Sequence, residues 1–355
     1  MRFGNGLAAF ACGVGLLGGL PPRAAACGAV APPGSYVRLA AEKTILIWDA
    51  AKKTEHFLRR PVFEGDPKDF GFLVPTPVVP EVAKVDAHVF AEMAALVPAP
   101  ATATAGMVGG GAGGGGDAVV VAQTVRLGDF ELVTLRAGDA RALVDWLGAH
   151  GYASRPSLEM WARRYVVRGW VLNAMRYAPE GGAARARTIE APAVRLSFAT
   201  ETPFYPYTEA PPDPREEQAF LARNKGAPKT RPLDLWVISA GEVEAREGQI
   251  AVGTDESPGP VRVAVASVPS WRLEAALASS SWFGVRARDT WTVTRFREDA
   301  LQRTAWDDLT FDAPRGEADD EQPPDRSRAL PLVLVAGAAL LALWLAFTDR
   351  SRPEE

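Results

Sequence analysis

The sequence predicts an α+β fold, with mixed or antiparallel β-sheets, a few packed helices and one C-terminal transmembrane helix. Short runs rich in β-forming residues recur along the chain, and glycine or proline bounds most of them. Only a few segments place apolar residues at helical spacing. They do not alternate with the strands in the regular order of a parallel α/β sheet. Near the C-terminus, residues 329–348 form a run of 20 residues without a charge.

The first predicted strands cover residues 44–49 and 54–62, and Pro61 indicates that the second one lies at a sheet edge or ends there. A third strand over 69–74 is expected to stop at Pro75, because proline has no N–H to donate to a ladder. Further strands are expected over 119–126 and 130–135, which form a hairpin at Gly128-Asp129, and over 169–175, 193–198, 235–239, 261–266 and 290–296.

Four helices are predicted from capping residues and apolar spacing. Asp86, Asp139 and Ser157 are the candidate N-caps, because their side-chain oxygens can accept from the first free backbone N–H groups of a helix. Gly151 is expected to end the second helix, with Tyr152 packing back onto it. The helices are expected over residues 86–96, 139–149, 157–165 and 270–278.

The N-terminus has the order of a secretory signal peptide. Arg2 precedes an apolar stretch over residues 7–20, and Ala24 and Ala26 supply the small side chains of a cleavage site. Cleavage there removes residues 1–26. The alternative is a buried N-terminal helix, which the absence of a polar face in the run disfavours.

The C-terminal run over 329–348 predicts a membrane span. At about 1.5 Å per residue its 20 residues reach about 30 Å, the thickness of a bilayer core. The alternative is a buried core helix. Two arginines flank each side of the run, so charge does not set its orientation. The signal peptide does: it places the main region outside the cytoplasm and leaves residues 349–355 as a cytoplasmic tail.

Between the two ends, residues 27–312 are expected to form one extracytoplasmic α+β region, followed by an acidic, proline-containing stalk over 313–328. A Pro/Ala/Thr stretch running into a glycine-rich stretch covers 97–117 and is a possible point of subdivision. It is not a phosphate-binding loop, because Asp117 follows the glycines where Lys-Ser or Lys-Thr is needed.

Cys27 is the only cysteine that remains after cleavage, so no internal disulfide is expected. Three interpretations stay open: a lipidated thiol, a disulfide to another chain, and a free thiol. Ala24 stands where lipidation sites usually carry a larger aliphatic residue, and a membrane span makes a lipid anchor redundant.

Composition excludes several classes of protein. With 47% hydrophobic and 23% charged residues, the chain is neither a disordered acidic protein nor a collagen, and two cysteines do not make a disulfide scaffold. The formal net charge of −4 gives no reason to expect a nucleic-acid partner. The expected partner is the lipid bilayer through residues 329–348, with a further envelope protein possible.

The sequence predicts no catalytic, cofactor-binding or metal-binding residues, and no cofactor. The three histidines, His56, His88 and His150, have no metal-ligand spacing, and no Cys-x-x-Cys is present. No Gly-x-Ser-x-Gly elbow marks a hydrolase. The histidines are expected to be structural or to lie on the surface.

The sequence resembles one family, the bacterial exported proteins catalogued as domain of unknown function 2330. The stretches that carry the resemblance are Ala26-Cys27-Gly28, residues 42–47, Gly65-Asp66, residues 69–77, Trp146-Leu147, Gly151-Tyr152, Tyr165, Gly169-Trp170 and residues 202–206. The resemblance implies export and a C-terminal anchor, but no activity. Many family members have another cysteine soon after the Cys-Gly pair, which residues 29–33 lack.

Together these observations predict a membrane-anchored extracytoplasmic protein that acts by binding or scaffolding at the cell envelope. The alternative is a membrane-tethered envelope hydrolase, and a third possibility is a structural partner in a membrane complex.

Overall fold

The computed structural model describes residues 28–65, 69–99, 120–177, 188–224, 230–254, 257–277, 288–300, 303 and 307–313. The expected signal peptide, Cys27, most of the glycine-rich stretch, the stalk beyond 313, the span and the tail lie outside these ranges. In the described part of the chain, no helix has the length and apolarity that a membrane crossing needs.

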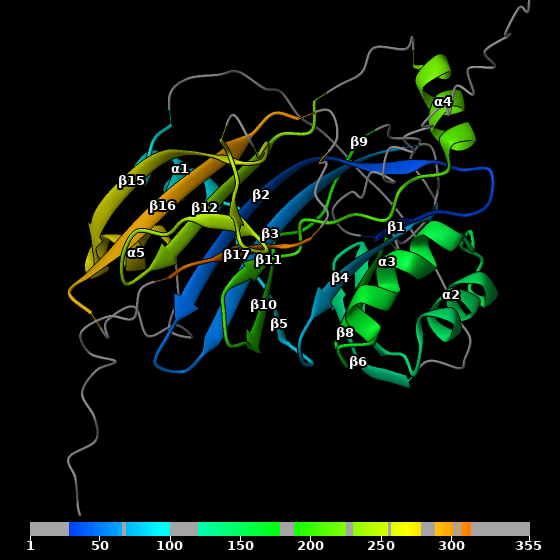
Figure 1. The fold of residues 1–355 in the computed structure, drawn as a ribbon, viewed down its shortest axis with the longest axis horizontal. Coiled ribbons are helices and arrows are strands. Elements are labelled where there is room, and N and C mark those ends of the chain that lie inside the picture. Colours follow the sequence, from blue (N-terminus) through cyan, green and yellow to red (C-terminus); the bar gives the residue numbers. More distant parts are fainter. Residues whose placement is uncertain are drawn as a thin grey trace, which may run out of the picture.

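The described elements are mostly strands, as the α+β prediction requires (Figure 1). The strands are β1 (Gly28–Val30), β2 (Val37–Asp49), β3 (Thr54–Gly65), β4 (Gly71–Thr76), β5 (Glu81–Lys84), β6 (Val120–Leu127), β7 (Phe130–Arg136), β8 (Val171–Tyr177), β9 (Thr188–Glu190), β10 (Val194–Ala199), β11 (Phe204–Tyr205), β12 (Leu233–Ser239), β13 (Ala245–Glu247), β14 (Ile250–Ala251), β15 (Val261–Pro269), β16 (Thr290–Glu298) and β17 (Leu309–Phe311). The helices are α1 (Val89–Leu96), α2 (Ala140–Ala149), α3 (Pro156–Val166), α4 (Pro214–Arg223) and α5 (Ser270–Ala276).

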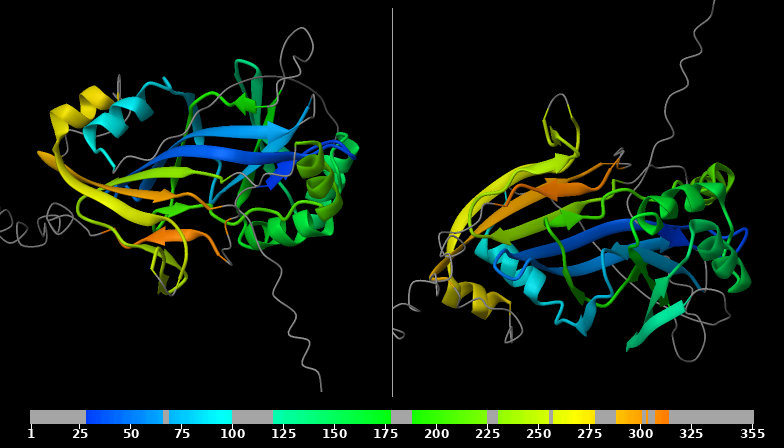
Figure 2. Two further views of the ribbon diagram at one scale, coloured as in Figure 1. Left: turned by 90° about the horizontal axis from the view of Figure 1, so that it is seen from above. Right: turned by 60° about the horizontal axis from the view of Figure 1, so that its bottom comes forward.

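The largest sheet has the order β15-β16-β12-β2-β3-β10-β5, with β9 also pairing with β3. It is mixed, because β12 runs parallel to β2 while the other pairs are antiparallel. Helices α1 and α5 lie side by side on one face of this sheet (Figure 2). In β2, Ile45 and Ile47 face these helices and Leu46 faces the opposite side, so both faces of the strand are buried. That explains the continuous apolar run seen in the sequence.

A second sheet has the order β1-β4-β8-β7-β6 and is antiparallel throughout. Helices α2 and α3 cover its outer face, where Leu143, Leu147, Trp161 and Tyr165 are buried. Strands β1 and β4 precede the glycine-rich stretch and β6, β7 and β8 follow it. That stretch therefore connects segments that belong to one sheet.

The central core lies between the inner faces of these two sheets and a small third sheet of order β11-β17-β13-β14. Aromatic side chains dominate it: Phe63 packs against Phe70 and Phe72 with ring centroids 4.9 Å apart in both pairs. Burial of such rings is the main apolar contribution to the stability of the fold.

The structure corrects two predictions that rest on proline. Pro61 lies inside β3, an interior strand, and not at an edge or an end. Its carbonyl accepts from Ala191 N at 3.0 Å, so its missing N–H faces the break between β9 and β10, where no donor is needed. Strand β4 runs through Pro75, which pairs with Leu172 of β8 beyond the end of β1.

Of the three predicted N-caps, one is confirmed and two are wrong. Asp139 caps α2 as expected, accepting from Ala142 N at 2.7 Å. Asp86 is not an N-cap, because α1 begins after His88 and the Asp86 carboxylate accepts from His88 N in the preceding turn. Ser157 is not a cap either: α3 begins at Pro156, and the Ser157 hydroxyl donates to Pro211 O.

Candidate functional site

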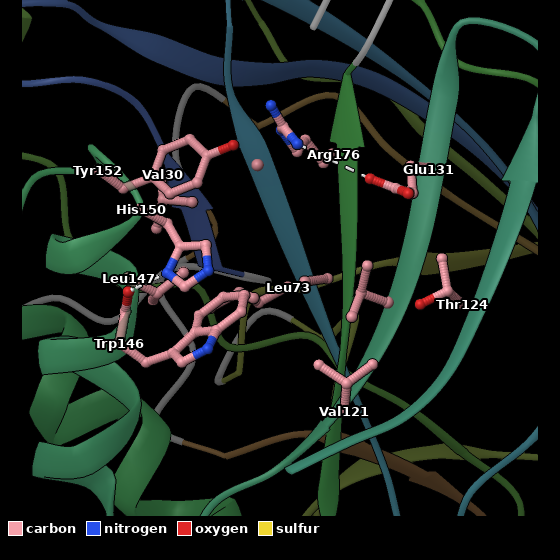
Figure 3. Close-up of a pocket in the computed structure, with 13 residues that line it drawn as sticks. Val30, Leu73, Val121, Thr124, Glu131, Trp146, Leu147, His150, Tyr152 and Arg176 are labelled. Atoms are coloured by element: carbon pink, nitrogen blue, oxygen red, sulfur yellow. Dashed lines mark hydrogen bonds and ion pairs between the residues drawn. The ribbon is translucent and has the colours of Figure 1, made fainter. Parts of the chain in front are cut away.

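A cavity of about 200 Å³ lies on the outer face of the second sheet, beside α2 (Figure 3). The sheet supplies its floor, α2 supplies one wall, and charged side chains gather at one end. The residues that line it are Val30, Gly71, Leu73, Val121, Thr124, Glu131, Val133, Trp146, Leu147, His150, Tyr152, Ala174 and Arg176.

The floor follows from the register of four strands. Thr124 of β6 pairs with Val133 of β7, Val133 with Ala174 of β8, and Ala174 with Leu73 of β4. Because paired residues point to the same face of a sheet, these four side chains form one row under the cavity. The small Ala174 in the middle of the row leaves room above the sheet.

The wall depends on how α2 ends. Gly151 adopts a left-handed conformation with φ of 86°, which glycine accepts without strain. The chain then turns back, and Tyr152 N donates to Leu147 O at 3.0 Å. Trp146 and His150, one helical turn apart, lie on the same side of α2, and Figure 3 shows both at the cavity together with Tyr152.

The polar end is centred on Arg176. Its guanidinium lies 3.7 Å from a carboxylate oxygen of Asp69 and 3.7 Å from one of Glu131. Tyr152 donates its hydroxyl to Asp69 at 2.9 Å. Burial raises the pKa of Tyr152 above its usual value, and the negative charge of Asp69 raises it further, so the phenol stays protonated. Arg126 pairs in register with Glu131 from the edge strand β6.

His150 and Trp146 form a stacked pair with ring centroids 3.6 Å apart. His150 Nδ1 lies 2.6 Å from the Trp146 carbonyl oxygen, which only accepts, so Nδ1 carries the proton. In the neutral ring, Nε2 is then an acceptor. Trp146 Nε1 is buried and has no hydrogen-bond partner, whereas Arg176 Nη2 lies in the 3.7 Å ion pair with Asp69. Other buried polar atoms of the described residues also lack a hydrogen-bond partner, and Trp146 differs from most of them because it lines a cavity.

A second hollow, of about 260 Å³, lies between α1 and α5. It is more open, and alanines and charged side chains supply most of its lining. Trp271 on its rim is 70% exposed. It is a surface groove without converging polar groups, and we do not assign a site to it.

The central core contains a different polar cluster, which we call the inner network: Glu42, Arg59, Tyr205, Tyr207, Glu298 and Arg303. Arg59 and Arg303 form ion pairs with Glu42, and Tyr205 donates to Glu42 at 2.6 Å. Tyr207 donates to Glu298 at 2.5 Å. Burial raises the pKa of Glu298, while the positive charge of Arg303 opposes the rise. These groups contact one another inside the core and line neither cavity, although Glu42 Oε1, Glu298 Oε2 and Arg303 Nη2 have no hydrogen-bond partner. We interpret the network as structural.

His56 and Ser197 form a pair that resembles a base and a nucleophile, with Nδ1 and Oγ 2.8 Å apart. Both side chains are buried, on the paired strands β3 and β10, and neither lines the cavities described above. Burial and the positive charge of Arg195 lower the pKa of His56 to about 4. A base this weak suits a structural cross-strand pair better than catalysis near neutral pH.

The sequence predicts no site residues, and its three histidines separate in the structure. His56 is buried, His88 lies on the surface in an ion pair with Glu92, and His150 lines the cavity. Sequence reasoning places Trp146 and Tyr152 next to the end of α2 but not His150 against a pocket. The strand row that completes the cavity has no local signal. Across the described ranges, no group of three or more His, Cys, Asp and Glu is placed to hold a metal ion.

Comparison with known proteins gives one match. The family model described as "Uncharacterized protein conserved in bacteria (DUF2330)" covers residues 21–210, which confirms the resemblance expected from the sequence. No curated protein and no solved structure matches the chain. The match ends before α4, so β12 to β17 lie beyond it.

Proposed function

We propose that this chain, which belongs to the family of uncharacterized bacterial proteins DUF2330, binds a small molecule in the cavity beside α2. The observation that carries the proposal is the cavity itself: apolar side chains form its floor, and charged and aromatic polar groups converge at one end. Ligand sites are typically concave, mostly apolar and equipped with a few placed polar groups. The whole lining lies between Val30 and Arg176, inside the family match.

The proposal also includes a location for the protein in the cell. The sequence supports export through residues 1–26 and anchoring in the bilayer through 329–348, so the cavity would lie outside the cytoplasm at the cell envelope. Alkaline extraction of membranes tests the anchor: an anchored chain stays in the pellet, and release of the intact chain would rule the anchor out. Digestion of the described region by protease added to spheroplasts supports export, and full protection contradicts it.

The hydrolase alternative receives no supporting observation. None of the residues that line the cavity is a serine or a cysteine. The hydroxyl that His56 contacts, on Ser197, is buried in the large sheet. We therefore place binding before catalysis.

Toluene tests the binding function, because it fills an apolar cavity without adding a charge. The full chain, held in lipid nanodiscs, is titrated with toluene and followed by calorimetry and saturation-transfer NMR. Val133→Phe, which projects a ring from the floor into the cavity, should abolish saturable binding. The matched control is Val167→Phe at a position that is 74% exposed, and it should bind as the unmodified chain does. Equal binding to both variants, or none to the unmodified chain, would overturn the proposal.

A further inference from the structure

We infer that the ligand is a small neutral molecule, a single ring or a branched chain, that carries one amide-like group able both to accept and to donate hydrogen bonds. This inference rests on the proposed function and names the chemistry of its ligand. Three observations carry it: the size of the cavity, the balance of charge at its polar end, and the hydrogen-bonding groups on its wall.

The size limits the apolar part of the ligand. An apolar cavity of about 150 Å³ is enough to hold benzene. The cavity here, at about 200 Å³, therefore accommodates one ring with a small substituent, but not a fused polycycle or a long acyl chain. The floor row of Leu73, Ala174 and Val133 offers aliphatic contacts to such a ring.

The charges at the polar end cancel. Arg176 lies between Asp69 and Glu131, and Arg126 stands opposite Glu131 on the neighbouring strand. Of these four residues, Arg176 and Glu131 line the cavity, one of each sign, and they leave no excess charge for a charged ligand to neutralise. An anion would face the Glu131 carboxylate and a cation would face the Arg176 guanidinium, and either would lose hydration on entering.

The wall provides complementary hydrogen-bonding groups for a neutral polar ligand. Trp146 has a buried N–H without a partner, and a ligand oxygen seated at the indole edge would supply the acceptor. His150, stacked on the same indole, has its Nδ1 proton engaged with the Trp146 carbonyl, so Nε2 of the neutral ring accepts a hydrogen bond from the ligand. A donor next to an acceptor on one ligand matches this pair, as in a primary amide or a hydroxyl.

An isosteric series of probes tests the inference: benzamide is neutral, benzoate is an anion, and benzamidine is a cation. Each is titrated by calorimetry into the full chain in nanodiscs, with toluene as the reference for shape alone. We expect benzamide to bind at least 10-fold more tightly than benzoate or benzamidine, and more tightly than toluene.

Variants locate the contacts. Trp146→Phe keeps an aromatic ring and removes the N–H, so the ratio of benzamide affinity to toluene affinity should fall by about 3- to 10-fold. Val167→Phe, at an exposed position outside the lining, should leave that ratio unchanged. Circular dichroism and urea unfolding of each variant establish that it is folded.

Each of the other outcomes would overturn a specific part of the inference or the proposed function. Preference for benzoate would replace the inference with an anion site at Arg176, and preference for benzamidine would replace it with a carboxylate site. Equal affinity for toluene and benzamide, or an unchanged ratio in Trp146→Phe, would show that polar recognition is absent while the proposed binding function stands. Failure of every probe, toluene included, would instead overturn the proposed function.

Discussion

The two polar regions of the molecule differ in their surroundings: the inner network is enclosed in the core, whereas the other region lines the cavity beside α2. In the inner network, the buried groups lie within contact of partners of opposite charge or hydrogen-bonding character, as Glu42 does with Arg59 and Tyr205. At the cavity, Trp146 keeps a buried N–H without a partner and Arg176 lies 3.7 Å from its nearest carboxylates. Glu42 Oε1 and Arg303 Nη2 in the inner network also lack a hydrogen-bond partner, but neither residue lines a cavity, whereas Trp146 does. An unused donor is open to a ligand only at a cavity; in a closed core it lowers stability.

The comparison distinguishes polar groups that stabilise the fold from polar groups that bind a ligand. Substitutions in the inner network should lower the free energy of unfolding and leave ligand affinity per folded molecule unchanged. Substitutions at the cavity should lower ligand affinity and leave the free energy of unfolding nearly unchanged. The following predictions run from the largest expected effect on stability to the smallest.

Arg59→Ala should have the largest effect. Arg59 is fully buried, forms an ion pair with Glu42 and lies 4.5 Å from the centroid of the Phe72 ring. Its removal leaves the buried Glu42 with the Tyr205 hydroxyl and with Arg303 at 3.7 Å, but without its closest cation. The loss of one member of a buried pair typically costs about 3–5 kcal/mol. Urea unfolding measures the loss. The double variant Glu42→Leu/Arg59→Met should recover part of it, because the Glu42 charge is also gone and Arg303 keeps its ion pair with Glu298 at 3.6 Å. A loss below about 1 kcal/mol in Arg59→Ala would contradict the structural role.

Tyr205→Phe should lower the free energy of unfolding by about 1–3 kcal/mol. The hydroxyl donates to Glu42 at 2.6 Å and accepts from Arg303 at 3.0 Å, and phenylalanine leaves both partners unsatisfied without changing the ring. Urea unfolding is again the measurement, with Trp146→Phe at the cavity as the control in the other region, because the indole N–H has no partner to lose. An unchanged free energy of unfolding in Tyr205→Phe would show that the inner network does not contribute to the stability of the fold.

Glu55→Gln should change how stability depends on pH. Burial raises the pKa of Glu55 well above 4.5, although the hydrogen bond from Phe204 N opposes the rise. The folded chain therefore keeps a proton that the unfolded chain releases, and the free energy of unfolding falls as pH rises above about 4.5. Glutamine cannot ionise and still accepts from Phe204 N. The variant should be more stable than the unmodified chain at pH 8 and gain little at pH 4, as measured by urea midpoints; a gain independent of pH would refute the assignment.

Trp146→Phe should have the smallest effect on the free protein, below about 1 kcal/mol. Its N–H has no partner to lose, and phenylalanine keeps a ring to stack on His150. Thermal unfolding without ligand measures this. A loss as large as that of Tyr205→Phe would erase the distinction between the two regions.

Sequence reasoning succeeds where the determining residues are neighbours in the chain. The hairpin at Gly128-Asp129 and the Asp139 cap of α2 are local, and the structure contains both. It fails where a segment far away in the chain determines the local structure. Pro61 indicates an edge strand by its own chemistry, but β9 and β10 leave a gap opposite it that makes an interior position acceptable. Ser157 has the chemistry of a cap, yet its hydroxyl donates to Pro211, 54 positions away.

By itself, the sequence determines the α+β class, the approximate positions of the longer strands and the two ends of α2, because hydrophobic period, capping and turn preference act within a few residues. The tertiary structure alone decides which strands become neighbours. That choice creates the row from Thr124 to Leu73, places His150 over it and pairs Arg59 with Glu42. Strand order and register are set by the free energy of burying both faces of each sheet at once. That quantity belongs to the whole chain, and no short stretch of sequence records it.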